Sequence, residues 1–375
     1  MDLFVTCANC LEPFLAQELA DLGYPQAVTG FRGVHVRDVS FDAIYRINYC
    51  SRIASRVLMP LARFRCHDDR SLYLGAGKID WMAYIPKGKT IAIDANVNHP
   101  RLRNSLYAAQ IVKDAICDQL REKTGERPSV NTRDPDIQLN LYIQDEWAGL
   151  SFDTSGMPLH KRGYRQESVE APMQETLAAA LLTLAQYKAG DVLCDPCCGS
   201  GTILIEAAMM ASQTPPGFLR NQWGFKSLPQ HSPEAWLKVK NEADQRRILL
   251  PKHQFFGADI NKQAIHACKV NLRAIGFQQS VEVVQCDIRD YTPPVTPNFI
   301  LTNPPYGRRL DDVDHLRTLY RAIGDFMKRK AAKPARGFVF TGSFELSKEV
   351  GLAANRRHVL DNGGIEARLL EFDLY

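Results

Sequence analysis

The sequence lacks the features that mark membrane and secreted proteins. No apolar run reaches about 18 residues, so a membrane-spanning helix is not expected. The start, Met1-Asp2-Leu3, has no basic residues ahead of a long apolar stretch, which argues against a secretory signal. The ten cysteines are scattered rather than spaced as a disulfide framework. These absences predict a protein of the reducing cytoplasm.

Two common nucleotide-binding patterns and a zinc pattern are also missing. The glycine-rich segment 195–202 has neither the Gly-x-Gly-x-x-Gly of dinucleotide sites nor the Gly-Lys-Ser/Thr of a P-loop. Cys7 with Cys10 and Cys194 with Cys197 form Cys-x-x-Cys pairs, but neither has a second pair at suitable spacing for a four-ligand zinc site. Nicotinamide and ATP are therefore not favoured, and no metal is expected.

Length and composition predict two or three domains. The 375 residues are 45% hydrophobic and 23% charged, and the net charge of +4 is too small to indicate nucleic-acid binding by itself. Strands and helices alternate in the N-terminal part, and a strand–loop–helix series follows it. The expected boundaries are 1–60 and 61–155 for two α+β units, 156–170 for a linker, and 171–375 for an α/β domain with an insertion at 212–250.

The α/β domain begins with a glycine loop and three acidic strand ends. A short buried strand is predicted to end at Asp195, with Gly199 and Gly201 following it before a helix. Glycines let a ligand approach the backbone, and the Asp195 carboxylate suits the ammonium group of S-adenosylmethionine. Asp259 and Asp287 end the next two predicted strands, where a doubly wound sheet can hold a ribose and an adenine amino group.

A fourth predicted strand, 298–302, leads into Asn303-Pro304-Pro305-Tyr306-Gly307. The exocyclic amine of guanine or adenine is a poor nucleophile, because its lone pair is delocalised into the ring. Hydrogen bonds from the amine to the Asn303 side-chain oxygen and the Pro304 carbonyl would make the nitrogen more tetrahedral. The two prolines stiffen the loop, and the Tyr306 ring offers a stacking surface. This segment predicts methylation of an amino group on a planar base.

These motifs resemble those of class I S-adenosylmethionine-dependent methyltransferases that methylate amino groups, over about residues 170–375. The whole chain is similar to the THUMP-containing bacterial 23S ribosomal RNA guanine-N2 methyltransferases of the RlmL type. Cys197 stands where that family has Phe, a tolerable change of a packing residue, and Cys10 where Gly is common. Further segments that carry the resemblance are Phe4–Cys7, Leu11-Glu12, Glu18-Leu19, Leu159–Arg165, Ala171-Pro172 and Glu175–Ala178.

The resemblance implies a fold, a reaction and a set of site residues. The fold would be α/β, a Rossmann-like domain with a seven-stranded, mostly parallel sheet, preceded by ferredoxin-like and THUMP domains. The reaction would be methylation of N2 of a guanine in 23S ribosomal RNA, with S-adenosylmethionine as the cofactor. The catalytic residues would be Asn303, Pro304 and Tyr306, and the cofactor-binding residues Thr176, Asp195, Cys197, Gly199, Gly201, Asp259, Ile260, Asp287, Ile288 and Asn303.

Local clusters of basic residues are candidates for RNA phosphate contacts. Arg52 and Arg56 are four residues apart and would share one face of a helix. Other basic residues, such as Arg162, Arg165 and Arg308, lie beside the expected site. The expected RNA contacts are Arg52, Arg56, Arg103, Lys161, Arg162, Arg165 and Arg308, although basic clusters also occur on solvated helix faces.

Several alternatives stay open on the sequence alone. The Asn-Pro-Pro-Tyr segment also serves adenine-N6 methylation of DNA, and a catalytically idle RNA-binding factor in ribosome assembly is the alternative of another class. The chain could act as a monomer or a homodimer. The insertion either walls the target-base pocket or packs as a surface element through its aromatic residues Phe218, Trp223, Phe225 and Trp236.

Overall fold

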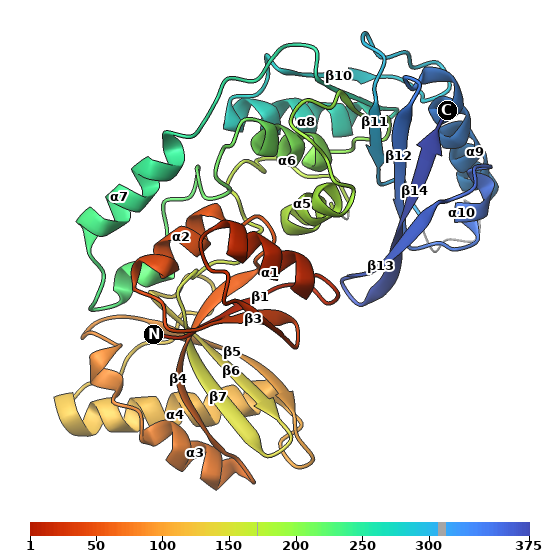
Figure 1. Ribbon diagram of the computed structural model, residues 1–375. Coiled ribbons are helices and arrows are strands. Elements are labelled where there is room, and N and C mark those ends of the chain that lie inside the picture. The colour runs from red at the N-terminus through yellow and green to blue at the C-terminus, as the bar shows by residue number, and fades with distance from the viewer. Residues whose placement is uncertain (171, 307–312) are drawn as a thin grey trace.

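The computed structural model describes residues 1–170, 172–306 and 313–375, and these form two lobes (Figure 1). The N-terminal lobe extends to Asp153, and the C-terminal lobe begins after a linker. Arg308, one of the expected RNA contacts, lies outside the described residues. Within the described part of the chain, no helix has the length and apolar character needed to cross a membrane.

One seven-stranded sheet runs through the whole N-terminal lobe, in the order β2-β3-β1-β4-β7-β6-β5. The long strand β4 joins the two halves of this sheet, because it pairs with β1 on one edge and with β7 on the other. Alternation of apolar residues along β6 buries one face. The elements are β1 (Leu3–Thr6), α1 (Glu12–Asp21), β2 (Val28–Gly30), β3 (Gly33–Val36), α2 (Asp42–Cys50), β4 (Arg56–Arg65), α3 (Asp69–Gly77), η1 (Trp81–Ala83), β5 (Ile91–Asn98), α4 (Ser105–Thr124), β6 (Ile137–Gln144) and β7 (Trp147–Asp153).

The C-terminal lobe contains the predicted α/β sheet, in the order β10-β9-β8-β11-β12-β14-β13. The first five strands are parallel, and β14 and β13 are antiparallel additions at one edge. The strand order reverses at β8, which pairs with both β9 and β11. Its elements are α5 (Glu175–Leu184), β8 (Leu193–Asp195), α6 (Thr202–Ala211), η2 (Gly224–Ser227), α7 (Pro233–Asp244), β9 (Phe255–Asp259), α8 (Lys262–Ile275), β10 (Val281–Gln285), β11 (Phe299–Thr302), α9 (Val313–Lys330), β12 (Ala335–Thr341), α10 (Leu346–Glu349), β13 (Arg356–Asn362) and β14 (Ile365–Leu374). The expected fold class is confirmed.

The insertion between α6 and β9 connects the lobes. Its helix α7 lies along α2 of the N-terminal lobe (Figure 1). Trp236 packs edge-on against Tyr49, with ring centroids 5.3 Å apart, and lies 5.8 Å from Tyr45. Trp223 and Phe225 stack at 5.5 Å in the same cluster. These aromatic side chains are therefore committed to the interface between the lobes.

We expect Trp236→Ala to destabilise the protein, because Trp236 is 7% exposed and its removal leaves a cavity among aromatic rings. Large-to-small changes of this kind cost about 3–5 kcal/mol. Urea unfolding monitored by circular dichroism measures the loss. The matched control is Leu237→Ala, since Leu237 is the next residue on α7 and is 52% exposed. Equal unfolding midpoints for the two variants would contradict the assignment of this interface.

Candidate functional site

The glycine loop after β8 has a backbone that favours glycine. Gly199 and Gly201 have φ angles of 55° and 83°, in the left-handed region. A Cβ on Gly201 would lie 2.3 Å from the Cys268 sulfur, so the loop packs directly on α8 there. Open space lies above Gly199, whose N–H donates to Asp259 Oδ2 at 2.9 Å. The loop is thus fixed by a neighbouring strand end and leaves room for a ligand at Gly199.

Asp195 is buried where β8 and β11 end side by side. Its Oδ1 accepts hydrogen bonds from the Thr302 hydroxyl at 2.7 Å and from the Cys197 N–H at 3.1 Å. Burial raises the pKa of Asp195 to about 7, although both hydrogen bonds favour the ionised form. Sequence reasoning missed Thr302. Its place at the end of the strand before Asn303 was the available signal.

Asp259 and Ile260 lie at the end of β9, next to the glycine loop. The two Asp259 carboxylate oxygens accept from the N–H groups of Gly199 and Asn261, both at 2.9 Å. Ile260 is 62% exposed. Because β8 and β9 are parallel neighbours, their carboxyl ends meet at one edge of the sheet. An apolar surface and an acceptor group are therefore available together beside the loop.

Asp287 follows β10 at the same edge. Its carboxylate accepts from the Arg289 guanidinium at 2.9 and 2.5 Å, and these hydrogen bonds hold the pKa of Asp287 at about 2. Ile288 is buried in the core beneath. Thr176 is buried at the start of α5, and Cys197 is half-buried in the glycine loop. The sheet thus brings the expected cofactor residues at its strand ends to one edge, with Ile288 mostly covered, whereas Thr176 lies on α5.

The segment that follows β11 presents an unpaired acceptor. The Asn303 Oδ1 atom is buried and has no hydrogen-bond partner within the described part of the chain. Tyr306 is held in place by the C-terminal hairpin, because its hydroxyl accepts from the Asn362 amide at 2.7 Å. Its ring lies so close to Gly342 that a Cβ there would be 2.9 Å away. A buried acceptor without a partner is costly, so this oxygen is suited to a ligand that donates.

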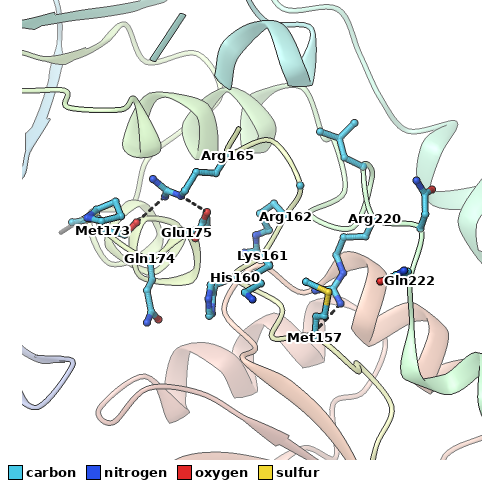
Figure 2. Close-up of a pocket in the computed structure, with 14 residues that line it drawn as sticks. Met157, His160, Lys161, Arg162, Arg165, Met173, Gln174, Glu175, Arg220 and Gln222 are labelled. Atoms are coloured by element: carbon cyan, nitrogen blue, oxygen red, sulfur yellow. Dashed lines mark hydrogen bonds and ion pairs between the residues drawn. The ribbon is translucent and has the colours of Figure 1, made fainter. Parts of the chain in front are cut away.

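Arg165, expected to contact RNA, fixes the glycine loop. Its guanidinium donates to the Glu175 carboxylate at 2.8 Å and to the Met173 carbonyl at 2.9 Å (Figure 2). It also donates to the hydroxyls of Ser200 and Thr202, both at 3.0 Å. All three guanidinium nitrogens are bonded within the protein, and a contact of Arg165 with RNA stays a prediction. This arginine ties the linker, the start of α5 and the glycine loop together.

Three other arginines expected to contact RNA are also committed to the protein. Arg162 is 2% exposed, and its Nη1 donates to the Leu159 carbonyl at 2.7 Å. Arg52 donates to the carbonyls of Met209 and Thr214 across the lobe interface. Arg56 pairs with the buried carboxylate of Asp153. These contacts give Arg52, Arg56 and Arg162 structural roles, and their contacts with RNA stay predictions. The shared helical face was wrong, because Arg52 lies in a loop and Arg56 begins β4.

A cavity of about 670 Å³ lies beside Arg165, lined by the linker, the start of α5 and the insertion (Figure 2). The exposed Lys161 lines it and forms no ion pair among the described residues. Arg103 is exposed elsewhere, in the N-terminal lobe. Both stay predicted RNA contacts. The residues lining the cavity are Met157, His160, Lys161, Arg162, Gly163, Arg165, Pro172, Met173, Gln174, Glu175, Leu219, Arg220, Asn221 and Gln222.

Comparison with known families agrees with this architecture. The RMKL-like methyltransferase domain matches residues 162–370, more than half of the chain. The chain belongs to the RMKL-like methyltransferase family. The RlmL ferredoxin-like domain matches residues 2–58 and the THUMP domain residues 66–153. The family predicted from the sequence is thus confirmed.

Relatives of this RMKL-like chain include longer proteins. The ribosomal RNA large subunit methyltransferase K/L of Syntrophotalea carbinolica is 40% identical over 99% of this chain, and that of Methylococcus capsulatus is 38% identical over 100%. The chain spans about half of these two relatives, 53% and 51% of their lengths.

Solved structures match over nearly the whole chain. SMU.472, solved in complex with SAH, is 26% identical with a TM-score of 0.88, and the match covers 100% of this chain and 98% of that one. A predicted N6-adenine-specific DNA methylase from Listeria monocytogenes is 28% identical with a TM-score of 0.87, covering 99% and 95%. The expected cofactor, S-adenosylmethionine, is confirmed by the methyltransferase domain and by the neighbour that holds SAH.

We expect Arg165→Ala to weaken S-adenosylmethionine binding by about 10- to 100-fold, because charged hydrogen bonds of about 1.5–3 kcal/mol each hold the glycine loop. Calorimetric titration measures the affinity. Arg165→Lys keeps the positive charge but loses the planar guanidinium with its several donors. Its affinity for S-adenosylmethionine should therefore lie between those of the wild type and Arg165→Ala. Lys161→Ala, a nearby exposed cation, serves as the control. Wild-type affinity in Arg165→Ala would show that the loop does not need this arginine.

Proposed function

We propose that this chain methylates the N2 amino group of a guanine in 23S ribosomal RNA, using S-adenosylmethionine as the methyl donor. The observation that carries the proposal is the buried Asn303 Oδ1, an acceptor without a partner among the described residues, at the sheet edge that holds the glycine loop. The names of the ribosomal RNA methyltransferase relatives support the choice of substrate. A cytoplasmic location would follow from such a substrate.

The residues around Asn303 suit the chemistry of an aromatic amine. Its two N–H groups would donate to the Asn303 side-chain oxygen and to the Pro304 carbonyl, which localises the lone pair on nitrogen. S-adenosylmethionine supplies an electrophilic methyl group on a sulfonium. As the nitrogen–carbon bond forms, the carbon–sulfur bond breaks, and the amine nitrogen then loses one proton to solvent. Tyr306, oriented by Asn362, would hold the base by stacking.

The cofactor would lie across the ends of β8, β9 and β10. Gly199 leaves room for close approach, while Asp259 would hold the ribose and Asp287 the adenine amino group. Ile260 is exposed beside Asp259 and could cover the adenine ring. Thr176 and Cys197 would complete the methionine end, and the negative charge of Asp195 at the end of β8 would favour its ammonium.

The choice of guanine over adenine rests on the family resemblance of the sequence rather than on the motif, and the names of the relatives specify only large-subunit ribosomal RNA. The Listeria neighbour, which carries an N6-adenine DNA methylase description, supports adenine methylation of DNA as the second candidate. The THUMP domain at 66–153 favours an RNA substrate for this chain. An idle assembly factor would need neither the open Gly199 loop nor the unpaired Asn303 oxygen.

Asn303→Ala should lower the rate of methyl transfer to ribosomal RNA by about 10²–10³-fold, the loss found when one preorganised hydrogen-bonding group at a reacting centre is removed. Radiolabelled methyl transfer measures the rate, and calorimetry should give a cofactor affinity within about threefold of the wild type. Asn303→Asp keeps an acceptor oxygen and should retain more activity than the alanine variant. Turnover by Asn303→Ala at the wild-type rate would refute the proposed role.

The affinity for S-adenosylmethionine should also depend on pH through Asp195. The pKa of this carboxyl is about 7 without a ligand, so it is mostly protonated below that pH. A bound cation favours the ionised form, and affinity should therefore fall as pH drops from 8 to 6 and level off above 8. Calorimetry across this range measures the slope. Asp195→Asn should flatten it, and a slope that survives the substitution would assign the effect to another group.

A further inference from the structure

The THUMP half of the N-terminal sheet has one face that no described helix covers. Helices α3 and α4 pack against each other on the apolar face, where Leu139, Leu141 and Ile143 are fully buried. Most side chains of the opposite face on β6 and β7 are half-buried or exposed, and Trp147 at 39% and Tyr142 at 38% are the most open of the large ones. Tyr142 and Trp147 lie in adjacent rows of two neighbouring strands, so the two exposed rings occur near each other on this face.

A bulge in β4 decides which side chains this face presents. The register between β4 and β7 shifts between Pro60 and Ala62. Before the shift, Val57 and Met59 face the core. After the shift, Ala62 and Phe64 face the core, and Arg63 and Arg65 point to the open face. In an unbroken strand, Arg63 and Arg65 would be in phase with Val57 and point into the core. One extra residue therefore delivers two cations to the open face.

These two arginines lie against the exposed tryptophan. Arg65 is directly opposite Trp147 across the strands, and its guanidinium carbon is 5.3 Å from the ring centroid. That of Arg63 is 4.6 Å from it. Neither arginine forms an ion pair or a side-chain hydrogen bond within the described ranges, unlike Arg56 at the start of the same strand. Their positive charge is thus free for an anionic partner.

A glycine opens a hollow in the middle of this cluster. Gly149 lies between Arg63 and Tyr142 in one row across the three strands, with Trp147 in the next row. A Cβ on Gly149 would meet only a backbone oxygen, at 3.9 Å, so the space above it is open. The hollow is floored by backbone and bordered by two aromatic rings and a guanidinium. Aromatic rings and a guanidinium around an open backbone position are groups on which a flat ring can stack.

We propose that this hollow, over Gly149 and bordered by Arg63, Arg65, Tyr142 and Trp147, binds an unpaired base of the RNA substrate. Base faces stack on aromatic rings and guanidinium planes, and the free cations would neutralise the flanking phosphates. The amide side chains of Gln144 and Asn96 lie in the same rows and offer hydrogen bonds to base edges. The proposal rests on the proposed RNA substrate and identifies how the N-terminal lobe holds it.

The hollow lies far from the catalytic edge. The β6–β7 turn beside Trp147 is at the end of the sheet that points away from the C-terminal lobe (Figure 1). A base bound there cannot be the one that is methylated. The hollow should therefore affect the KM for RNA and leave kcat unchanged, which separates it from the proposed reacting centre at Asn303.

The test uses the full chain and a fluorescein-labelled 12-nucleotide RNA, single-stranded or annealed to its complement, with binding followed by fluorescence anisotropy. Trp147→Ala should weaken single-strand binding by about 5- to 100-fold, the range of base–aromatic stacking. Trp147→Phe keeps a ring and should lose much less. Phe31→Ala, at a 72% exposed aromatic in another part of the lobe, is the control and should bind like the wild type.

Gly149→Val fills the hollow without removing any contact. Valine is favoured in strands and the position is open, so thermal unfolding should be unchanged while single-strand binding falls at least as much as in Trp147→Ala. The proposal would be overturned if Gly149→Val bound the single strand as tightly as the wild type does. It would also be overturned if the wild-type chain bound single-stranded and duplex RNA with equal affinity. Because anisotropy needs no methyl transfer, it gives an answer even if the chain proves inactive on ribosomal RNA.

Discussion

The hydrogen bond between the Thr302 hydroxyl and the buried Asp195 carboxylate joins the two motifs on which the site depends. Asp195 begins the glycine loop, and Thr302 is followed at once by Asn303. Parallel pairing of β8 with β11 brings the two strand ends together, and the hydrogen bond fixes their spacing. The distance between the proposed methyl donor and the proposed amine is therefore set inside the core, where few side chains can move.

A second constraint is the burial of charge between the lobes. Glu206 and Arg162 are almost fully covered, and Arg52 reaches carbonyls of the other lobe. Breaking a buried pair leaves an unpaired charge, which costs several kcal/mol. These buried groups fix the orientation of the two lobes relative to each other, and the aromatic cluster around Trp236 reinforces it. For an enzyme whose N-terminal lobe would dock RNA while the other reacts, a fixed relation delivers the target to Asn303 reproducibly.

Local pattern was enough to predict many elements. The sequence indicated strands that end at Asp195 and Asp259 and a strand at 298–302, and β8, β9 and β11 end at these residues because short apolar runs are local signals. The acidic strand ends were placed for the same reason. The roles of Arg52, Arg162 and Arg165 were not predictable, since most of their partners lie far away along the chain. The bulge in β4 and the support of Tyr306 by Asn362 also arise only on folding.

The nucleoside that this chain produces tests the central claim most directly. Ribosomal RNA from a bacterial strain lacking the corresponding gene would be digested and analysed by mass spectrometry, with and without the wild-type chain supplied in trans. The account predicts that N2-methylguanosine from 23S RNA is restored by the chain. Restoration of N6-methyladenosine instead, or no change in any methylated nucleoside, would contradict it.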